Sequence, residues 1–181
     1  MRRSSTGVCR MATVLVFTGL PGSGKSTLAE RVARTLGAPV FSGDWLMGAL
    51  TPSGVLDHLD RPAYLDVYYG LLQTLMVRQV MLDQSAIVDC LVDGDRVTTW
   101  REIIAQHGAN LVIVECACSD VALHRSRVEG RKRDIPGWHE VDWEHVERMR
   151  SDFPPLATAD ITVDSIDSVE TNSSIVLSLL Q

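Results

Sequence analysis

The eight residues GLPGSGKS, at positions 19–26, follow the pattern G-x-x-x-x-G-K-[ST]. Glycines at these positions let the backbone curl so that successive N–H groups face an anion with no side chain in the way. The ammonium of Lys25 then reaches the outer phosphates, and the hydroxyl of Ser26 is placed to ligate Mg²⁺. The pattern predicts a nucleotide phosphate-binding loop, here called the P-loop. The residues expected to bind the nucleotide in it are Gly22, Ser23, Gly24, Lys25, Ser26 and Thr27.

P-loops occur in GTPase switches, ATPase motors and small kinases, so this motif alone does not select among them. The chain has no N-K-x-D motif for reading guanine, and its one D-x-x-G, residues 134–137, does not follow an apolar strand. A motor ATPase would normally need more chain than 181 residues. These features favour a small kinase.

Several further pieces of the chain resemble the small P-loop kinase family, an AAA-type ATP-binding kinase-like domain. That family includes chloramphenicol phosphotransferase, polynucleotide kinase and, more distantly, adenylate kinase. The matching pieces are VLVFTGLPGSGKST, SGD at 42–44, AIVDC at 86–90, RSRVEGR at 125–131, and DFPPL and ADITVDS toward the end. The resemblance covers nearly the whole chain from Thr13 onward. The P-loop is its most specific motif, and the other pieces support it by their order and spacing along the chain. It implies a three-layer α/β P-loop NTPase fold, with a mostly parallel five-stranded sheet, an arginine-rich lid, and ATP and Mg²⁺ as cofactors.

Two aspartates follow apolar runs at positions suited to phosphoryl transfer. Asp44 lies just beyond the short run Val40–Phe41, where relatives place an aspartate facing the acceptor hydroxyl. A carboxylate there can orient and deprotonate the attacking hydroxyl, although Asp44 also suits an N-cap of a helix beginning at Trp45. Asp89 ends the run AIVD, and an acid at the tip of a buried strand suits Mg²⁺ together with Ser26; a hydrogen-bonded strand-end acid is the alternative.

Basic residues are concentrated between positions 125 and 133, where five of nine residues are Arg or Lys and only Glu129 is acidic. A solvated helix face usually interleaves acids, so this composition predicts a lid over the nucleotide, at about residues 125–140. In relatives, an R-x-x-x-R pair places one guanidinium over adenine and the other on the phosphates. The resemblance assigns these nucleotide-binding positions to Arg127 and Arg131, and catalytic roles to Lys25, Asp44 and Arg131.

The acceptor is expected to bind between Asp44 and the segment 46–69, which mixes polar and aromatic residues. The candidate acceptor-binding residues are Asp44, Trp45, Arg61, Tyr64, Tyr68 and Arg96. Unlike adenylate kinase, the segment lacks an arginine series for a nucleoside monophosphate and contains only Arg61. A neutral hydroxyl on an antibiotic, nucleoside or sugar-like molecule is therefore the expected acceptor. A polynucleotide or nucleotide kinase and a non-catalytic ATP-binding regulatory protein stay open as alternatives.

Hydrophobic patterning indicates the elements that must position these residues. Apolar runs predict strands over residues 13–18, 40–41, 86–91, 111–117 and 161–163. Helical spacing predicts helices over 26–36, 61–83, 96–107, 120–129, 142–150 and 169–180. Alternating strands and helices predict a parallel sheet covered on both faces. We expect one P-loop kinase domain over residues 12–181 after a flexible tail over 1–11, with Met1 and Met11 both plausible starts.

The composition excludes several other classes of protein. The charged residues, 17 basic and 23 acidic, give a net charge of −6, so nucleic acid is not expected as a partner. No apolar run reaches the roughly 20 residues that span a bilayer, and the four cysteines show no metal-binding spacing. A cytoplasmic location and no membrane association are expected, and the oligomeric state is left open.

Overall fold

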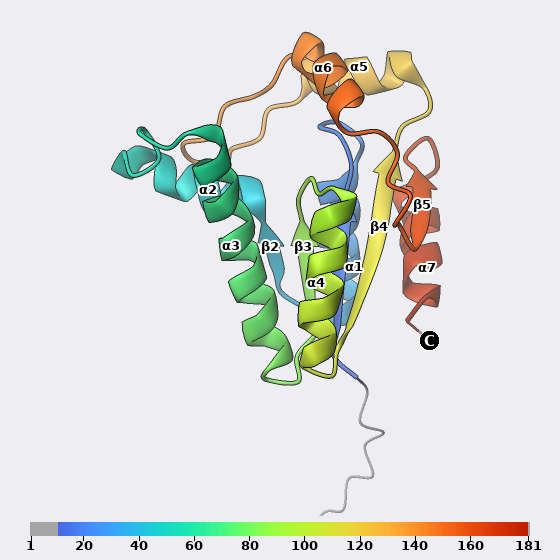
Figure 1. Ribbon diagram of the computed structural model, residues 1–181. Coiled ribbons are helices and arrows are strands. Elements are labelled where there is room, and N and C mark those ends of the chain that lie inside the picture. The colour runs from blue at the N-terminus through green and yellow to red at the C-terminus, as the bar shows by residue number, and fades with distance from the viewer. Residues whose placement is uncertain (1–10, 181) are drawn as a thin grey trace, which may run out of the picture.

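A computed structural model describes residues 11–180, and at its centre lies a five-stranded sheet in the order β2-β3-β1-β4-β5 (Figure 1). All the strand pairs in this sheet are parallel. The strands are β1 (Thr13–Thr18), β2 (Val40–Ser42), β3 (Ala86–Asp89), β4 (Asn110–Ala117) and β5 (Ile161–Asp164). The expected α/β fold is confirmed, and the mostly parallel sheet is a fully parallel one.

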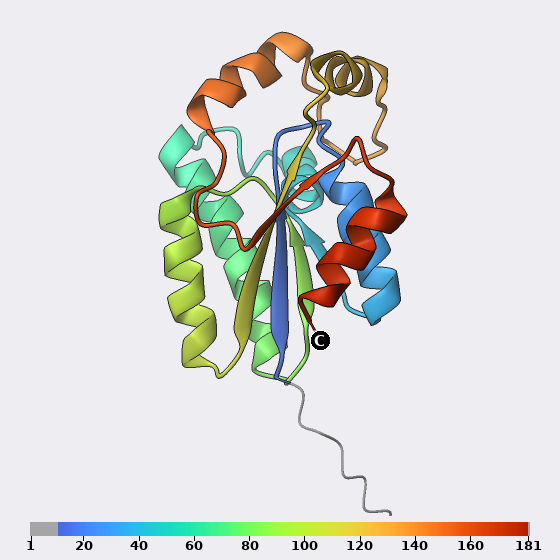
Figure 2. The same ribbon diagram turned by 90° about the vertical axis from the view of Figure 1, so that its right-hand side faces the viewer.

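Helices cover both faces of the sheet, which therefore forms the middle of three layers (Figure 2). The helices α1 (Lys25–Leu36) and α7 (Val169–Ser178) pack together on one face. On the other face lie α3 (Arg61–Val80) and α4 (Gly94–Gln106). The helices α5 (Val121–Gly130) and α6 (Trp143–Asp152) lie beyond the carboxyl ends of the strands, and α2 (Gly43–Leu50) continues into a short 3-10 helix at Thr51–Ser53.

Strand β1 shows why a continuous apolar run fits this architecture. Val14 and Val16 pack into the core on the α3 and α4 side, whereas Leu15 and Phe17 pack into the core on the α1 and α7 side. All four side chains are fully buried. A strand with helices over both faces needs apolar residues at every position, because neither set of alternating side chains meets water.

The element boundaries differ from the sequence-based expectation mainly where loops begin. The strand expected over 86–91 ends at Asp89, and the helix expected from residue 96 begins at Gly94 after its N-cap, Asp93. The helix expected at Trp45 begins at Gly43, so Asp44 lies in its first turn and is not its N-cap. Position 43 requires a glycine, because any Cβ there would overlap the hydroxyl end of the Tyr68 ring.

The expected lid corresponds to α5 and the loop that joins it to α6. This loop, residues 131–142, reaches across the carboxyl ends of the strands to α2 (Figure 1). The approach is close, because a Cβ at Gly48 of α2 would meet the carbonyl of Pro136 and one at Gly137 would meet the carbonyl of Gly48. The lid therefore rests on α2. None of the helices between residues 11 and 180 has the length and apolar character needed to cross a membrane.

Candidate active site

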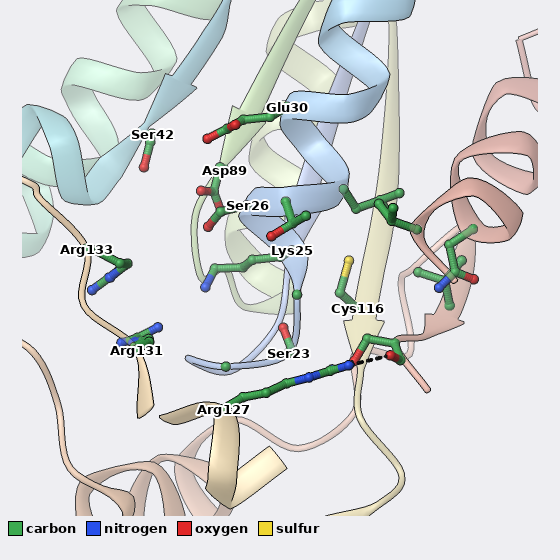
Figure 3. Close-up of a pocket in the computed structure, with 18 of the residues that line it drawn as sticks. Ser23, Lys25, Ser26, Glu30, Ser42, Asp89, Cys116, Arg127, Arg131 and Arg133 are labelled. Carbon is green, nitrogen blue, oxygen red and sulfur yellow. Dashed lines mark hydrogen bonds between the residues drawn. The ribbon is translucent and has the colours of Figure 1, made fainter. Parts of the chain in front are cut away.

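A cleft of about 1000 Å³ lies at the carboxyl ends of the strands, between the P-loop and the lid (Figure 3). Ligands of open α/β sheets bind at this end of the strands. Every P-loop residue expected to bind the nucleotide lines the cleft, and so do Asp89, Arg127 and Arg131. Arg133, Trp45 and a stretch around Ser165 complete its wall. The volume is at the upper end of the range of about 300–1000 Å³ for small-molecule sites.

The P-loop connects β1 to α1 and turns through glycines whose backbone is left-handed. Gly24 is the N-cap of α1, with φ of 85°, and provides no side chain to cap the helix. The N–H groups of the first turn therefore keep their capacity to bind an anion, and the helix dipole favours a negative charge there. Gly22, with φ of 86°, passes so close to α5 that a Cβ would lie 2.6 Å from Val128 Cγ2. The loop thus fits a phosphate group on one side and the lid helix on the other.

Asp89 lies beside the P-loop because β1, β2 and β3 end at the same level. Asp89 is paired with Phe17 of β1 and with Ser42 of β2. Its side chain points toward Ser26, with Lys25 along the same wall (Figure 3). The residue is only 6% exposed, and within the described chain its Oδ1 atom has no hydrogen-bond partner.

The electrostatics of Asp89 fit a cation in this position. Burial raises the pKa of Asp89, while the charge of Lys25 and an interaction with the Ser26 hydroxyl oppose that rise. The described residues contain no group of three or more His, Cys, Asp or Glu that could form a metal cage. Mg²⁺ commonly binds one or two protein oxygens and takes its other ligands from phosphates and water. The Ser26 hydroxyl and the unpartnered carboxylate oxygen of Asp89 suit that mode of binding.

The two arginines of the R-x-x-x-R pair occupy different parts of the cleft. Arg127 donates hydrogen bonds to the Ser165 hydroxyl at 2.7 Å and to the Ser165 carbonyl at 2.9 Å (Figure 3). This links α5 to the loop between β5 and α7. Arg131 lies on the opposite side of the cleft mouth, facing the end of Lys25. Its Nη2 atom is buried and has no hydrogen-bond partner in the described part of the chain.

A cluster of ion pairs connects the lid to α2. Glu140 accepts a hydrogen bond from Arg131 Nε at 2.9 Å and one from the backbone N–H of Arg133 at 2.7 Å. Arg133 Nη1 in turn lies 2.6 Å from Asp44 Oδ2, and both side chains are largely shielded from solvent. Partial burial raises the pKa of Glu140, but the Arg133 N–H and the two guanidinium groups outweigh this and hold it below its ordinary value. The lid therefore contacts the expected catalytic base directly.

Three aromatic residues lie near Asp44. Trp45 is 53% exposed and lines the cleft. Burial, followed by the charge of Asp44, raises the pKa of Tyr64, which places this phenol near the carboxylate. Tyr68 is buried against Gly43. Trp45, Tyr64 and Tyr68 thus lie near Asp44, but of these four residues only Trp45 lines the cleft.

The remaining two candidate acceptor residues lie elsewhere. The Arg96 guanidinium lies 4.6 Å from the centroid of the Tyr69 ring. Arg61 is the first residue of α3, and neither arginine lines the cleft. Sequence reasoning placed Arg133 in the basic cluster of the lid without a separate role, and it assigned no role to Glu140. The basic composition around Arg133 signalled it, whereas nothing local marks Glu140 as its partner.

Comparison with known proteins supports the architecture. A shikimate kinase of Mesorhizobium japonicum is 26% identical over 155 residues, which cover 84% of this chain and 73% of that protein. The structure of a sugar kinase from Janibacter sp. HTCC2649 covers 94% of each chain at 17% identity, with a TM-score of 0.68. An APS kinase of Mycobacterium tuberculosis, in complex with AMPPNP and APS, covers 94% of this chain and 98% of its own at 18% identity, with a TM-score of 0.63.

These structural likenesses show a shared P-loop kinase fold. The family model AAA_33, described as an AAA domain, matches residues 14–156, which include the P-loop, Asp44, Asp89 and the entire lid. That match extends over well more than half of the chain. The chain therefore belongs to the AAA_33 family, as its resemblance to the small P-loop kinases predicts.

Proposed function

We propose that this protein is an ATP-dependent kinase that transfers the γ-phosphate to a hydroxyl of a small neutral molecule. The observation that carries the proposal is the ion pair between Asp44, in the first turn of α2, and Arg133, a lid residue that lines the cleft. Arg133 and Trp45, which adjoins Asp44 in sequence, line the same cleft as the P-loop, so a donor bound at the P-loop and an acceptor bound beside Asp44 would be neighbours. ATP as the donor is supported by the family match and by the AMPPNP in the related APS kinase.

Phosphoryl transfer depends mainly on positioning and on stabilising charge over the transferred group. In the proposed complex the P-loop N–H groups and Lys25 bind the phosphates from one side, and Arg131 binds them from the lid. Ser26 and Asp89 would hold Mg²⁺, which neutralises charge on the phosphate oxygens. The free Nη2 of Arg131 and the unpartnered Oδ1 of Asp89 are the atoms that a bound nucleotide and its metal ion would satisfy.

Asp44 supplies the proton acceptor in this proposal. As the acceptor oxygen forms a bond to the γ-phosphorus, its proton passes to the Asp44 carboxylate and the bond to the bridging oxygen of ADP breaks. General-base assistance of this kind contributes roughly 10²–10⁴-fold to the rate. Arg133 fixes the orientation of the carboxylate through the 2.6 Å ion pair, and it does so only when the lid rests on α2. Closure of the lid then excludes water from the cleft before the phosphoryl group is transferred, which suppresses ATP hydrolysis.

The charges near Asp44 favour a neutral acceptor. The guanidinium closest to it, that of Arg133, already binds Asp44 and Glu140. Arg61 and Arg96 do not line the cleft, so neither guanidinium is placed to pair with an anionic group of an acceptor inside it. The exposed Trp45 indole instead offers an apolar surface of the kind that packs against a sugar or other ring. A sugar-like molecule, a nucleoside or an antibiotic fits this description, and phosphorylation of an antibiotic would confer resistance.

The test is a phosphorylation screen with ATP over neutral polyols, nucleosides and hydroxylated antibiotics, with mass spectrometry for an added phosphate. Shikimate and APS, named for the related kinases, form the anionic arm of the screen. We expect a neutral product that requires Lys25, so Lys25→Ala should abolish it. A product found only in the anionic arm would overturn the acceptor assignment. Equal products from the wild type and from Lys25→Ala would overturn the site.

A further inference from the structure

A buried histidine contacts the back of the P-loop, on the side away from the nucleotide. His124 lies on α5, is 2% exposed and does not line the cleft. Its Nε2 atom is 2.8 Å from the carbonyl oxygen of Pro21. The ring also supports the next residue, because a Cβ at Gly22 would lie 3.1 Å from His124 Cδ2. Both contacted residues belong to the turn that shapes the phosphate cradle.

The partners of the ring determine where its proton lies. A carbonyl oxygen only accepts hydrogen bonds, so Nε2 of His124 must carry the proton and donate it to Pro21. In the neutral ring, Nδ1 is then an acceptor. Arg150 Nη2, an obligate donor on α6, lies 3.3 Å from that atom. The neutral Nε2–H tautomer is the form of His124 that satisfies both contacts.

Helix α6 packs around the same ring. Trp143 meets His124 edge to face with the ring centroids 5.2 Å apart, and the Arg150 guanidinium lies 5.9 Å from the centroid of the Trp143 ring. Helices α5 and α6 are the two flanks of the lid loop, since one ends at residue 130 and the other begins at residue 143. One side chain therefore links the P-loop to both ends of the lid.

We propose that His124 is a positioning residue for the nucleotide site, which in its neutral form holds the P-loop turn at Pro21 and Gly22 against the lid helices. It touches no substrate and acts through the backbone that does. Protonation would place a second N–H toward the Arg150 guanidinium, so the link to α6 would break and the support of the P-loop would weaken. The inference rests on the proposed binding of a nucleotide at the P-loop.

The surroundings of His124 define the direction of the pH response. Burial lowers the pKa of His124 below its ordinary value of 6.5, the Pro21 carbonyl opposes this, and Arg150 and Arg127 lower it further. Glu147 of α6 raises the pKa of His124, as does the hydrogen bond to the Pro21 carbonyl of the P-loop. Because the folded protein favours the neutral ring, the stabilisation from His124 is present at neutral pH. It is lost as the pH falls from about 6.5 through the lowered pKa of the folded state.

The experiment measures ADP affinity by calorimetry from pH 5.5 to pH 8 for the wild type, His124→Gln and His124→Leu. A glutamine amide can donate to the Pro21 carbonyl but does not titrate, whereas leucine fills the space and leaves that carbonyl unpaired. We expect His124→Leu to weaken ADP binding by about 3- to 10-fold at pH 8, the effect of one lost buried hydrogen bond. His124→Gln should bind within about twofold of the wild type at pH 8 and should bind more tightly than the wild type at pH 5.5. The titration of ADP itself is common to all three proteins and cancels in these ratios.

Two further variants keep the test decisive. Arg150→Gln should reduce the difference between the wild type and His124→Gln at low pH. Arg148→Gln, also on α6 but in an exposed ion pair with Glu144, should leave ADP affinity unchanged. If His124→Leu does not fold, the comparison of ADP affinity between the wild type and His124→Gln at low pH still tests the role of His124. Equal affinities for wild type and His124→Gln at every pH, or equal losses in both His124 variants at pH 8, would overturn the role of His124. A wild type that binds no ADP would overturn the nucleotide site itself.

Discussion

The two walls of the cleft are constructed in different ways. The P-loop wall comes from one short stretch of chain between β1 and α1, on strands that are buried on both faces. The opposite wall, which we propose to bind the acceptor and call the acceptor wall, brings together α2 and a lid loop that is distant in sequence, and ion pairs between side chains hold it. Asp44 and Arg133 are separated by 89 positions along the chain.

This difference indicates a division of labour. A phosphate group is the same in every nucleotide, so a backbone cradle with fixed geometry suits it. An acceptor must be admitted and enclosed before transfer, which suits a wall that opens and closes at a few ionic contacts. The walls should therefore respond differently to substitution, and the following changes test that contrast from the largest expected effect to the smallest.

Arg131→Ala should reduce kcat by about 10³-fold, because it removes a positive charge that we place on the transferred phosphoryl group. Arg125→Ala is the matched control, since Arg125 is also a lid arginine paired with a glutamate but is 59% exposed. Steady-state kinetics with ATP and the acceptor from the screen would measure both. Similar losses in the two variants would show that general lid charge, and not Arg131 itself, promotes transfer.

Arg133→Gln should lower kcat by about 10- to 100-fold, because hydrogen bonds to charged groups contribute about 1.5–3 kcal/mol and this one orients Asp44. ATP hydrolysis without acceptor should rise relative to transfer, since the lid loses its ion pair to α2. The neighbouring exposed cation gives a control, Lys132→Gln, in which both rates should stay at wild-type values. A kcat for Arg133→Gln equal to that of the control would contradict the proposed positioning of Asp44.

Asp89→Asn should raise the free energy of unfolding by about 1 kcal/mol at pH 7 while it removes Mg²⁺-dependent activity. Burial raises the pKa of Asp89, so the folded protein holds this proton to a higher pH than the unfolded chain does. Stability consequently falls as the pH rises from the ordinary value of 3.8 through the raised pKa, and the full cost is present at neutral pH. Urea unfolding at pH 3 and pH 7 measures the gain, which should nearly vanish at pH 3, below the ordinary pKa of 3.8.

Asp66→Asn is the control for this measurement, because Asp66 is an exposed acid on α3. Its free energy of unfolding should match that of the wild type at both pH values. A destabilised Asp89→Asn protein at pH 7 would mean that the carboxylate makes a structural contact that the folded state needs.

The same contrast explains how much of the molecule could be predicted from the sequence. The P-loop and the five strands were predicted because their determinants are local: glycine spacing for the loop and unbroken apolar runs for the strands. Asp89 was predicted for a related reason, since the end of a parallel strand beside a P-loop has a known place in the sheet. The structure confirms the fold and brings these residues to one cleft.

The acceptor wall was less predictable because its geometry depends on contacts between distant segments. Arg61 and Arg96 fitted an acceptor site by residue type, yet Arg96 packs over Tyr69 and neither lines the cleft. Helix α2 begins two residues early, at Gly43, whose missing side chain leaves room for the Tyr68 ring, a contact that no local pattern encodes. Glu140 likewise shows its role only once the lid folds back on α2.

The central claim is that Asp44 serves as the catalytic base of a kinase, and Asp44→Asn tests it most directly. The measurement is the kcat for phosphorylation of the acceptor, together with the dissociation constant of ADP, in the wild type and the variant. We predict that kcat falls by roughly 10²–10⁴-fold while ADP affinity stays within about twofold, because Asp44 is not among the residues that line the cleft around the P-loop. An Asp44→Asn protein that phosphorylates its acceptor at the wild-type rate would contradict this account.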